Sequence, residues 1–220
     1  MQSSDAKKLA PMARAAMGLA LVFAPMVVAA MENPHAIHRP SPALMEQLAQ
    51  LAAQPQRPVR KELVWSGADI DGDGAPDFAN PTGAAPRGHD DFGDGRFGAR
   101  RDGGSRSHEG VDYVGAAGQD VHAPISGYVT KIGYAYAGSS DLKFVEITNP
   151  ALGYVARAFY VKPGVEVGDS VRLGQPIGTI ESLQRRYPGI INHVHLEVME
   201  PGGERVNAAE LITQKTVVRA

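Results

Sequence analysis

The sequence predicts a mostly β protein, with an antiparallel β-sheet sandwich or open barrel, one N-terminal helix and a long Gly/Asp-rich loop. The 25 glycines and 16 prolines, with only 6% aromatic residues, indicate short strands joined by tight turns. Short segments rich in Val, Ile, Tyr and Phe follow one another from residue 111 onward. No long amphipathic helix interrupts these segments, so an antiparallel arrangement is expected.

Residues 1–30 are interpreted as a signal peptide outside the fold. Three basic residues precede a long apolar stretch, and residues 28–30 offer small side chains for cleavage. A single transmembrane anchor is the alternative, because the apolar run over 15–31 is close to the lower length limit for spanning. In either case the rest of the chain is expected to be exported, to the periplasm or the medium. After cleavage of the leader we expect no stable membrane insertion.

The net charge and the cysteine content exclude some functions and some kinds of site. The net charge is −2 for the whole chain, which leaves no basic surplus for binding nucleic acid. The chain has no cysteine, so no disulfide holds the exported domain together. A zinc site would therefore use histidine and carboxylate ligands. The sequence does not indicate an oligomeric state.

Residues 31–64 are interpreted as a linker that contains one short helix over 41–54. The helix begins with a serine, which suits the N-cap, and a proline, which suits the first turn. Three leucines then recur at spacing i, i+4 and i+7. We expect this helix to lie outside the core, and whether it covers the functional groove stays open.

Residues 65–107 form a Gly/Asp-rich segment with little periodicity, which is typical of functional or disordered loops. Part of it matches a calcium loop at positions 1, 3, 5 and 9, with glycine at position 6: Asp69, Asp71, Asp73 and Asp77. Position 12 is Asn80 in place of the bidentate glutamate, and no flanking helices are evident. The alternative is a pair of Asp-Gly turns on a solvated loop.

Residues 108–214 are expected to form the β domain. Turn residues separate its predicted strands, which are DVHAP, GYVTKIGYAY, LKFVEIT, GYVARAFYV, SVRLGQPIGTI and HVHLEVM. The last of these carries two of the seven histidines of the chain. Because alternate residues of a strand point the same way, His193, His195 and Glu197 would share one face, opposite an apolar core face. Such a polar face is either a solvated surface or a site.

The segment SRSHEGVDY offers further metal ligands. His108 and Asp112 lie four residues apart, so in extended backbone both would face one side. Two imidazoles and one carboxylate make a three-ligand zinc site with one open position. Zinc lowers the pKa of a water in that position to about 7, which produces a hydrolytic nucleophile.

Four segments resemble, in this order, the lysostaphin-type (LytM-like) zinc endopeptidases: HEGVD, GQDVHAPISGYV, VEVGDSVRLGQPIG and HVHLEV. The resemblance spans His108 to Met199. It implies a β-sheet core and cleavage of peptide bonds in bacterial cell-wall peptidoglycan. Carried over by position, it implies zinc ligation by His108, Asp112 and His195, and a catalytic role for His193.

The sequence departs from that family on a middle strand. The family usually carries a further histidine there, in a Tyr-x-His-Leu setting, whereas this chain has none between His122 and His193. Tyr160 stands near the expected place. Its hydroxyl can donate a hydrogen bond to a developing oxyanion, but an ordinary pKa near 10 makes it a poor general base.

The segments AFYVKPG and LQRRYPGIINHVHLE make the leukocyte-derived chemotaxin-like branch of the family the most similar one. The resemblance implies animal secreted proteins that keep the zinc site, lack the middle histidine and use the fold for recognition. Two hypotheses follow. The preferred one is a zinc metallopeptidase that hydrolyses peptide cross-links in peptidoglycan, because the H-x-H pair is complete. The alternative is an inactive zinc-binding recognition module for wall peptides or a protein partner.

Other features are interpreted as structural. Two segments also resemble the biotinyl and lipoyl carrier fold, but the lysine that a carrier needs on a hairpin tip is missing. Arg100 and Arg101 are expected to be a solvated pair rather than a clamp for a substrate carboxylate. His89 is expected at the surface, near enough to line the site, and Tyr187 is expected to shape the loop before the H-x-H strand.

Overall fold

The computed structural model describes residues 40–53 and 60–219, and the predicted signal peptide lies outside them. The chain divides into two units, Met1–Arg57 and Pro58–Ala220. In the first unit, helix α2 (Pro42–Ala53) confirms the predicted helix, and the Ser41 hydroxyl accepts a hydrogen bond from the Leu44 amide as an N-cap. Within the described ranges, no helix has the length and apolar character needed to cross a bilayer.

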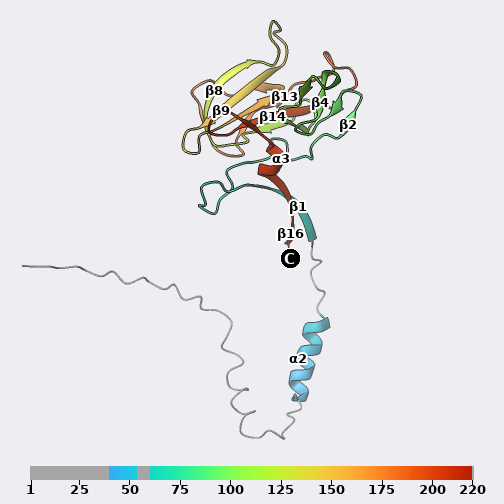
Figure 1. The fold of residues 1–220 in the computed structure, drawn as a ribbon. Helices are drawn as coiled ribbons and strands as arrows, with labels where there is room; N and C mark the ends of the chain where they lie inside the picture. The colour runs from blue at the N-terminus through green and yellow to red at the C-terminus, as the bar shows by residue number, and fades with distance from the viewer. Residues whose placement is uncertain (1–39, 54–59, 220) are drawn as a thin grey trace, which may run out of the picture. The chain divides into compact units, whose positions relative to one another are not determined.

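The second unit is mostly β, and every strand pair in it is antiparallel, as predicted (Figure 1). The larger sheet has seven strands, in the order β12-β8-β9-β10-β14-β15 with β6 beside β14. Its strands are β6 (Val111–Val114), β8 (Gly127–Tyr134), β9 (Lys143–Asn149), β10 (Tyr154–Phe159), β12 (Ser170–Val171), β14 (His193–Met199) and β15 (Arg205–Val206). A three-stranded sheet contains β7 (Asp120–His122), β11 (Val161–Pro163) and β13 (Pro176–Ile180).

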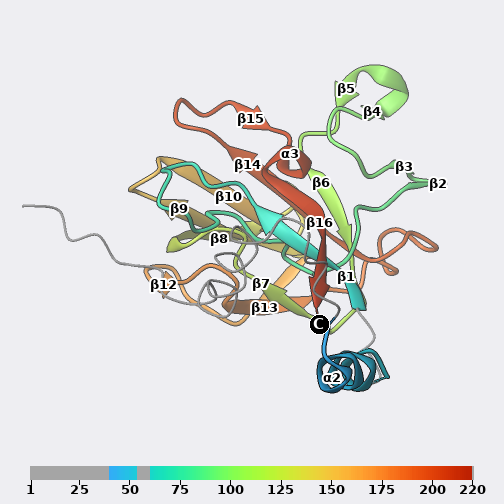
Figure 2. The same cartoon turned by 90° about the horizontal axis from the view of Figure 1, so that it is seen from below.

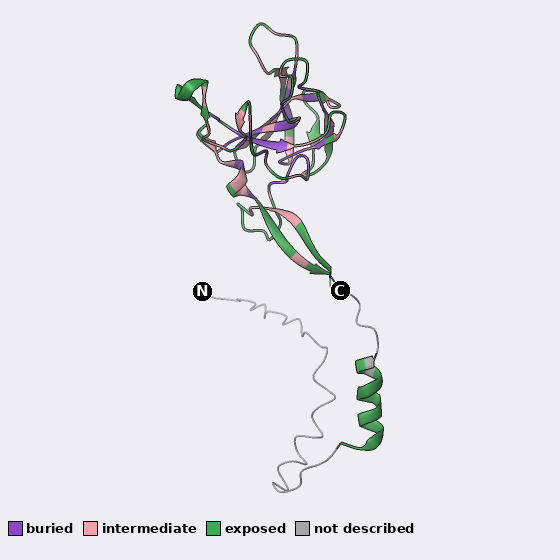
Figure 3. Ribbon diagram, turned by 90° about the vertical axis from the view of Figure 1, so that its right-hand side faces the viewer, coloured by how far each residue is buried: buried purple, intermediate pink, exposed green. Residues whose placement is uncertain are grey.

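One face of the larger sheet forms the core. On β14, Val194, Leu196 and Val198 are fully buried, as the alternating pattern predicts. Neighbouring strands add their own alternate residues to the same cluster, including Val111 on β6 and Ala156 on β10. Figure 3 shows the buried segments gathered within the sheets. The opposite face of β14 is therefore the one that presents the two histidines.

After Gly67, the Gly/Asp-rich segment contains only very short elements: β2 (His89–Asp90), β3 (Gly93–Asp94), β4 (Arg100–Arg101), the 3-10 turn η1 (Asp102–Gly104) and β5 (Arg106–Ser107). Strand β1 (Arg60–Gly67) begins in the stretch expected to be a linker. It pairs with β16 (Ile212–Arg219), which follows the short helix α3 (Ala208–Leu211), and this pairing was not predicted. The ribbon of β1 and β16 is largely exposed (Figure 3).

Candidate metal centre

Strand register brings the first two candidate ligands together. Strand β14 lies between β10 on one edge and β6 on the other, and His195 stands directly opposite Asp112 of β6 (Figure 2). Directly opposed residues of an antiparallel pair have Cβ atoms about 5 Å apart on the same face. The register thus joins two residues that are 83 positions apart in the sequence, with 2.9 Å between His195 Nδ1 and Asp112 Oδ1.

His108 completes the group from the segment just before β6. Its backbone is fixed, because its amide donates to the Ala99 carbonyl and its carbonyl accepts from the Gly98 amide. His108 Nε2 lies 2.9 Å from His195 Nδ1 and 3.1 Å from Asp112 Oδ1. The three candidate ligand atoms therefore form a compact triangle, and all three side chains lie within reach of one ion.

The triangle fits zinc in size and donor type. Tetrahedral zinc with bonds of about 2.0–2.1 Å places its ligand atoms about 3.3 Å apart, close to the observed separations. Two imidazole nitrogens and one carboxylate oxygen are also the donor set of catalytic zinc sites. His108 and Asp112 are buried, so little water competes for their ligand atoms.

Hydrogen bonds on the far side of each ring orient the ligands. His108 Nδ1 lies 2.8 Å from the Arg96 carbonyl, which can only accept, so the Nε2 lone pair faces the triangle. His195 Nε2 lies 3.5 Å from a carboxylate oxygen of Glu197, which leaves the Nδ1 lone pair for the centre. Partners of this kind fix the tautomer of metal-binding histidines. Glu197 is itself held by Arg205, at 3.2 Å.

Arg87 holds the other oxygen of Asp112, and sequence reasoning missed it. Its Nη2 donates to Asp112 Oδ2 at 2.9 Å, and its Nη1 contacts Asp90 at 2.6 Å and donates to the Gly93 carbonyl at 2.9 Å. The side chains of Arg87 and Asp112 are 2% and 3% exposed. The guanidinium leaves Oδ1 as the oxygen that faces the two histidines.

The electrostatics of the group favour a cation. Burial alone would raise the pKa of Asp112, but the close contacts of its carboxylate with the His108 and His195 rings hold that pKa well below its usual range. Burial alone would lower the pKa of His195, yet its hydrogen bonds to Asp112 and Glu197 raise that pKa to about 9. Without a metal, a proton on His195 therefore supplies positive charge between the two carboxylates.

His193 lies beside the triangle. Its Nδ1 is 2.6 Å from the Ile191 carbonyl, so its Nε2 carries the lone pair. That Nε2 is 3.6 Å from Asp112 Oδ1, and His193 does not belong to the candidate ligand group. Burial lowers the pKa of His193, so the ring is neutral and able to accept a proton.

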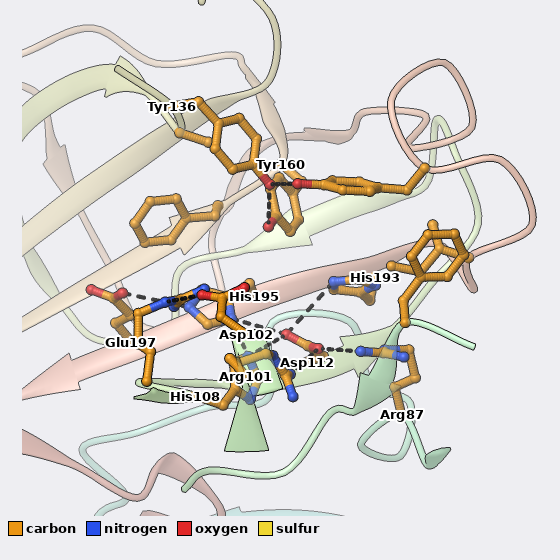
Figure 4. A pocket seen from close by; sticks show the side chains of 16 residues that line it. Arg87, Arg101, Asp102, His108, Asp112, Tyr136, Tyr160, His193, His195 and Glu197 are labelled. Carbon is orange, nitrogen blue, oxygen red and sulfur yellow. Dashed lines mark hydrogen bonds and ion pairs between the residues drawn. The ribbon is translucent and has the colours of Figure 1, made fainter. Parts of the chain in front are cut away.

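These residues form one end of a pocket of about 330 Å³ (Figure 4). Aromatic side chains form the opposite wall, and Tyr160 lies there with its ring centroid 5.3 Å from that of His193. The backbone of Tyr160 has a φ of 68°, a left-handed conformation that costs a bulky residue about 1–3 kcal/mol. Burial raises the pKa of its hydroxyl to about 12, so the group is a donor at neutral pH.

A close backbone approach supports His195. A Cβ on Gly110 would lie 2.5 Å from the Leu196 carbonyl oxygen and 2.7 Å from Cε1 of His195. Any side chain at position 110 would therefore push against the ring. Glycine is required here by space, because the segment that leads into β6 passes close beside its partner strand β14.

Three of the four calcium-loop aspartates lie close together. Carboxylate oxygens of Asp69, Asp71 and Asp77 lie within 4.8 Å of one another, and Asp73 is outside that group. Asn80 at position 12 is buried and accepts from the amides of its own turn. Calcium binding by this loop stays a prediction.

The structure corrects one smaller expectation, for Arg101, and adds to another, for Tyr187. Arg101 lines the pocket with a side chain only 15% exposed, and its Nη2 donates to the Asp94 carbonyl at 2.7 Å, whereas Arg100 is exposed. Tyr187 also lines the pocket, so it contributes to the site as well as to its loop. His89 is exposed and lies outside the pocket lining.

The fold and the site define a mostly β domain with a candidate metal centre, and the comparisons identify the family. The model of peptidase family M23 matches residues 106–208. Leukocyte cell-derived chemotaxin-2 of Mus musculus is 33% identical over 108 residues, which are 49% of this chain and 69% of that protein. This chain belongs to peptidase family M23, a family of zinc metallopeptidases that act on peptidoglycan peptides.

Other relatives match over different shares of their length. Myeloid protein 1 of Gallus gallus is 35% identical over 120 residues, 54% of this chain but only 36% of that protein. Among solved structures, the catalytic domain of lysostaphin from Staphylococcus simulans is 23% identical with a TM-score of 0.42, covering 52% of this chain and 86% of that one. A zinc containing peptidase from Vibrio cholerae is 23% identical with a TM-score of 0.44, and the match covers 60% of this chain and 39% of that one.

Proposed function

We propose that this protein is an exported zinc metalloendopeptidase that hydrolyses peptide cross-links of bacterial peptidoglycan. The observation that carries the proposal is the triangle of His108, Asp112 and His195, with a fourth side chain, His193, beside it but outside the ligand group. A recognition module would need only the three side chains that bind zinc. The neutral, oriented ring of His193 is the additional group that hydrolysis requires.

His108, Asp112 and His195 would hold the zinc ion. Bound there, zinc would polarise the scissile carbonyl and lower the pKa of a bound water to about 7. The Arg96 carbonyl and the Glu197 carboxylate accept from the outer ring nitrogens of His108 and His195, and Arg87 donates to the outer oxygen of Asp112. These contacts keep the three zinc ligands oriented without using their facing lone pairs.

His193 would act as the general base. Its Nε2 accepts a proton from the attacking water, and the resulting hydroxide adds to the carbonyl carbon of the peptide. The proton then passes to the amide nitrogen as the carbon–nitrogen bond breaks, so the products are a carboxylic acid and an amine. A positioned base of this kind contributes about 10²–10⁴-fold to the rate. Tyr160 faces the same space from the opposite wall.

Two observations favour the second candidate, a zinc-binding recognition module. Tyr160, directly after the middle strand β10, stands near the place where the family usually has a histidine. The relative from Mus musculus is also named a chemotaxin. In that function the same groove would bind wall peptides or a protein partner without cleaving them.

The test is digestion of purified peptidoglycan by the zinc-loaded protein, with release of new amino termini as the readout. We expect product that disappears with a chelator and returns with zinc. His193→Ala should reduce the rate at least about 10²-fold with zinc content unchanged. Retained zinc and bound peptidoglycan without any product would establish the recognition module. Loss of zinc in His193→Ala would show that the ligand assignment is wrong.

A further inference from the structure

Three tyrosine hydroxyls form a single chain on the pocket wall that faces the histidines. The Tyr136 hydroxyl lies 2.9 Å from that of Tyr187 and 3.0 Å from that of Tyr160. They come from three segments: the turn after β8, the junction of β10 and β11, and the loop before β14. Figure 4 shows Tyr136 and Tyr160 across the pocket from Asp112 and Arg87.

Packing alone does not explain these hydroxyls. The three rings rest on a small apolar cluster of Leu142, Leu183 and Ile190. Phenylalanine would fill the same space without bringing polar atoms into a half-buried wall. The hydroxyl groups therefore call for a role in the pocket.

Arg186 sets the direction of the chain. Its Nε donates to the Tyr187 hydroxyl at 3.3 Å, and its guanidinium carbon lies 3.8 Å from the centroid of the Tyr136 ring. A guanidinium has no acceptor, so the Tyr187 oxygen must accept from it. The Tyr187 hydroxyl then donates its hydrogen bond to the Tyr136 oxygen, and the Tyr136 hydroxyl donates to the Tyr160 oxygen. The cation over the Tyr136 ring draws electron density from it, which favours the same direction.

The last proton of the chain belongs to Tyr160. Its hydroxyl oxygen accepts from Tyr136, which among the described residues is the one recorded hydrogen-bond partner of that hydroxyl. Its own O–H therefore remains for an acceptor inside the pocket. The residue is also fixed: its amide donates to the Lys143 carbonyl at 2.7 Å, and its carbonyl accepts from the Glu181 amide at 2.8 Å. These bonds hold the left-handed backbone in place.

We propose that Arg186, Tyr187 and Tyr136 form a hydrogen-bond relay that makes Tyr160 the oxyanion donor of the peptidase. Tyr160 is the catalytic residue, and its O–H donates a hydrogen bond to the carbonyl oxygen as negative charge develops there. No proton is transferred along the chain. The other three are positioning residues that polarise and orient this donor. The inference rests on the proposed peptidase function and assigns the role of the missing middle-strand histidine to this relay.

The kinetic test compares phenylalanine variants of the zinc-loaded protein. Removing an oxyanion donor costs about 10²–10³-fold in kcat, which is the effect expected for Tyr160→Phe with KM unchanged. Tyr136→Phe should lower kcat about 2- to 12-fold, the effect of one net hydrogen bond. The double variant should be no slower than Tyr160→Phe alone, because the relay acts only through Tyr160. Tyr128→Phe, an exposed tyrosine on β8, is the matched control and should not change kcat.

A binding test separates this inference from the peptidase proposal. A phosphinate peptide carries a tetrahedral phosphorus whose two oxygens share a negative charge, whereas the matching amide peptide has a neutral, planar carbonyl group. At equal zinc content and melting temperature, Tyr160→Phe and Tyr136→Phe should weaken phosphinate binding in calorimetry and leave amide binding unchanged. If the wild type cleaves nothing but this pattern holds, the peptidase proposal fails, and what stands is the relay that makes Tyr160 a hydrogen-bond donor to an anionic oxygen in the pocket. Phosphinate binding equal to wild type in both variants would overturn the relay. The relay would also be overturned if Tyr136→Phe lowered kcat by the same factor in the wild type and in the Tyr160→Phe variant.

Discussion

Replacement of Arg87 by methionine tests how buried polar contacts support the candidate metal centre. The guanidinium is almost fully buried and makes a 2.9 Å hydrogen bond to Asp112, which is equally buried. Methionine keeps most of the side-chain volume but removes the charge and every donor. The variant therefore removes the closest cationic partner of the Asp112 carboxylate. In the metal-free protein the histidines and the more distant Arg101, whose Nη2 lies 3.9 Å from Asp112 Oδ2, remain to balance it.

The burial of the Arg87–Asp112 ion pair determines how much stability Arg87→Met should lose. Breaking a buried ion pair by removing one partner costs about 3–5 kcal/mol. The second partner, Asp90, is 15% exposed and keeps the Phe92 amide, so its share of the loss is smaller. We expect the free energy of unfolding in the presence of a chelator to fall by about 3–4 kcal/mol, a large part of the stability of a domain this size.

The assay is urea denaturation of the metal-free protein. Arg96→Met is the matched control, because that side chain is 78% exposed and its ion pair with Asp94 should contribute about 0–1 kcal/mol. The double variant Arg87→Met/Asp112→Asn should lose less stability than the sum of the single variants, since the two residues share one contact. A loss below about 1 kcal/mol for Arg87→Met, equal to that of the control, would refute the buried pairing.

Three further predictions concern the centre and the acidic loop. Gly110→Ala should lower zinc affinity, measured against a competing chelator, because the added methyl displaces the His195 ring; unchanged affinity would contradict the close approach. The pKa of His195 is raised to about 9, above the unfolded value near 6.5, so its contribution to the metal-free fold is complete below pH 6.5 and is lost as pH rises through 9. Urea denaturation in the presence of a chelator should show the free energy of unfolding falling between pH 6.5 and 9, and His195→Gln should remove this pH dependence. The same pH dependence in the variant would show that another group causes it. If the acidic loop binds calcium weakly, Asp77→Asn should abolish binding in calorimetry and Asp73→Asn should not, whereas equal effects would contradict the three-carboxylate group.

The β fold and the H-x-H face were predictable because both depend on local periodicity. Alternation along HVHLEV placed His193, His195 and Glu197 on one face without knowledge of any partner strand. The structure agrees, since the residues between them are fully buried on the other face. The pairing of His195 with Asp112 depends on the register of β14 against β6, and a single strand does not encode its register.

The residues that surround the candidate ligands could not be predicted from the sequence, for a different reason. Arg87 lies in a Gly/Asp-rich segment without periodicity, where an arginine is expected in solvent. Its burial arises only when that segment folds over β6. Tyr136 and Tyr187 lie 24 and 27 positions from Tyr160. No spacing rule connects three loops, so their common wall appears only in three dimensions.

Anomalous diffraction at the zinc edge, from crystals of the zinc-loaded protein, tests the proposed centre most directly. The account predicts one peak at about 2.0–2.1 Å from His108 Nε2, Asp112 Oδ1 and His195 Nδ1, with His193 outside bonding distance. A peak bonded to His193, or no peak among these three atoms at full zinc occupancy, would contradict it.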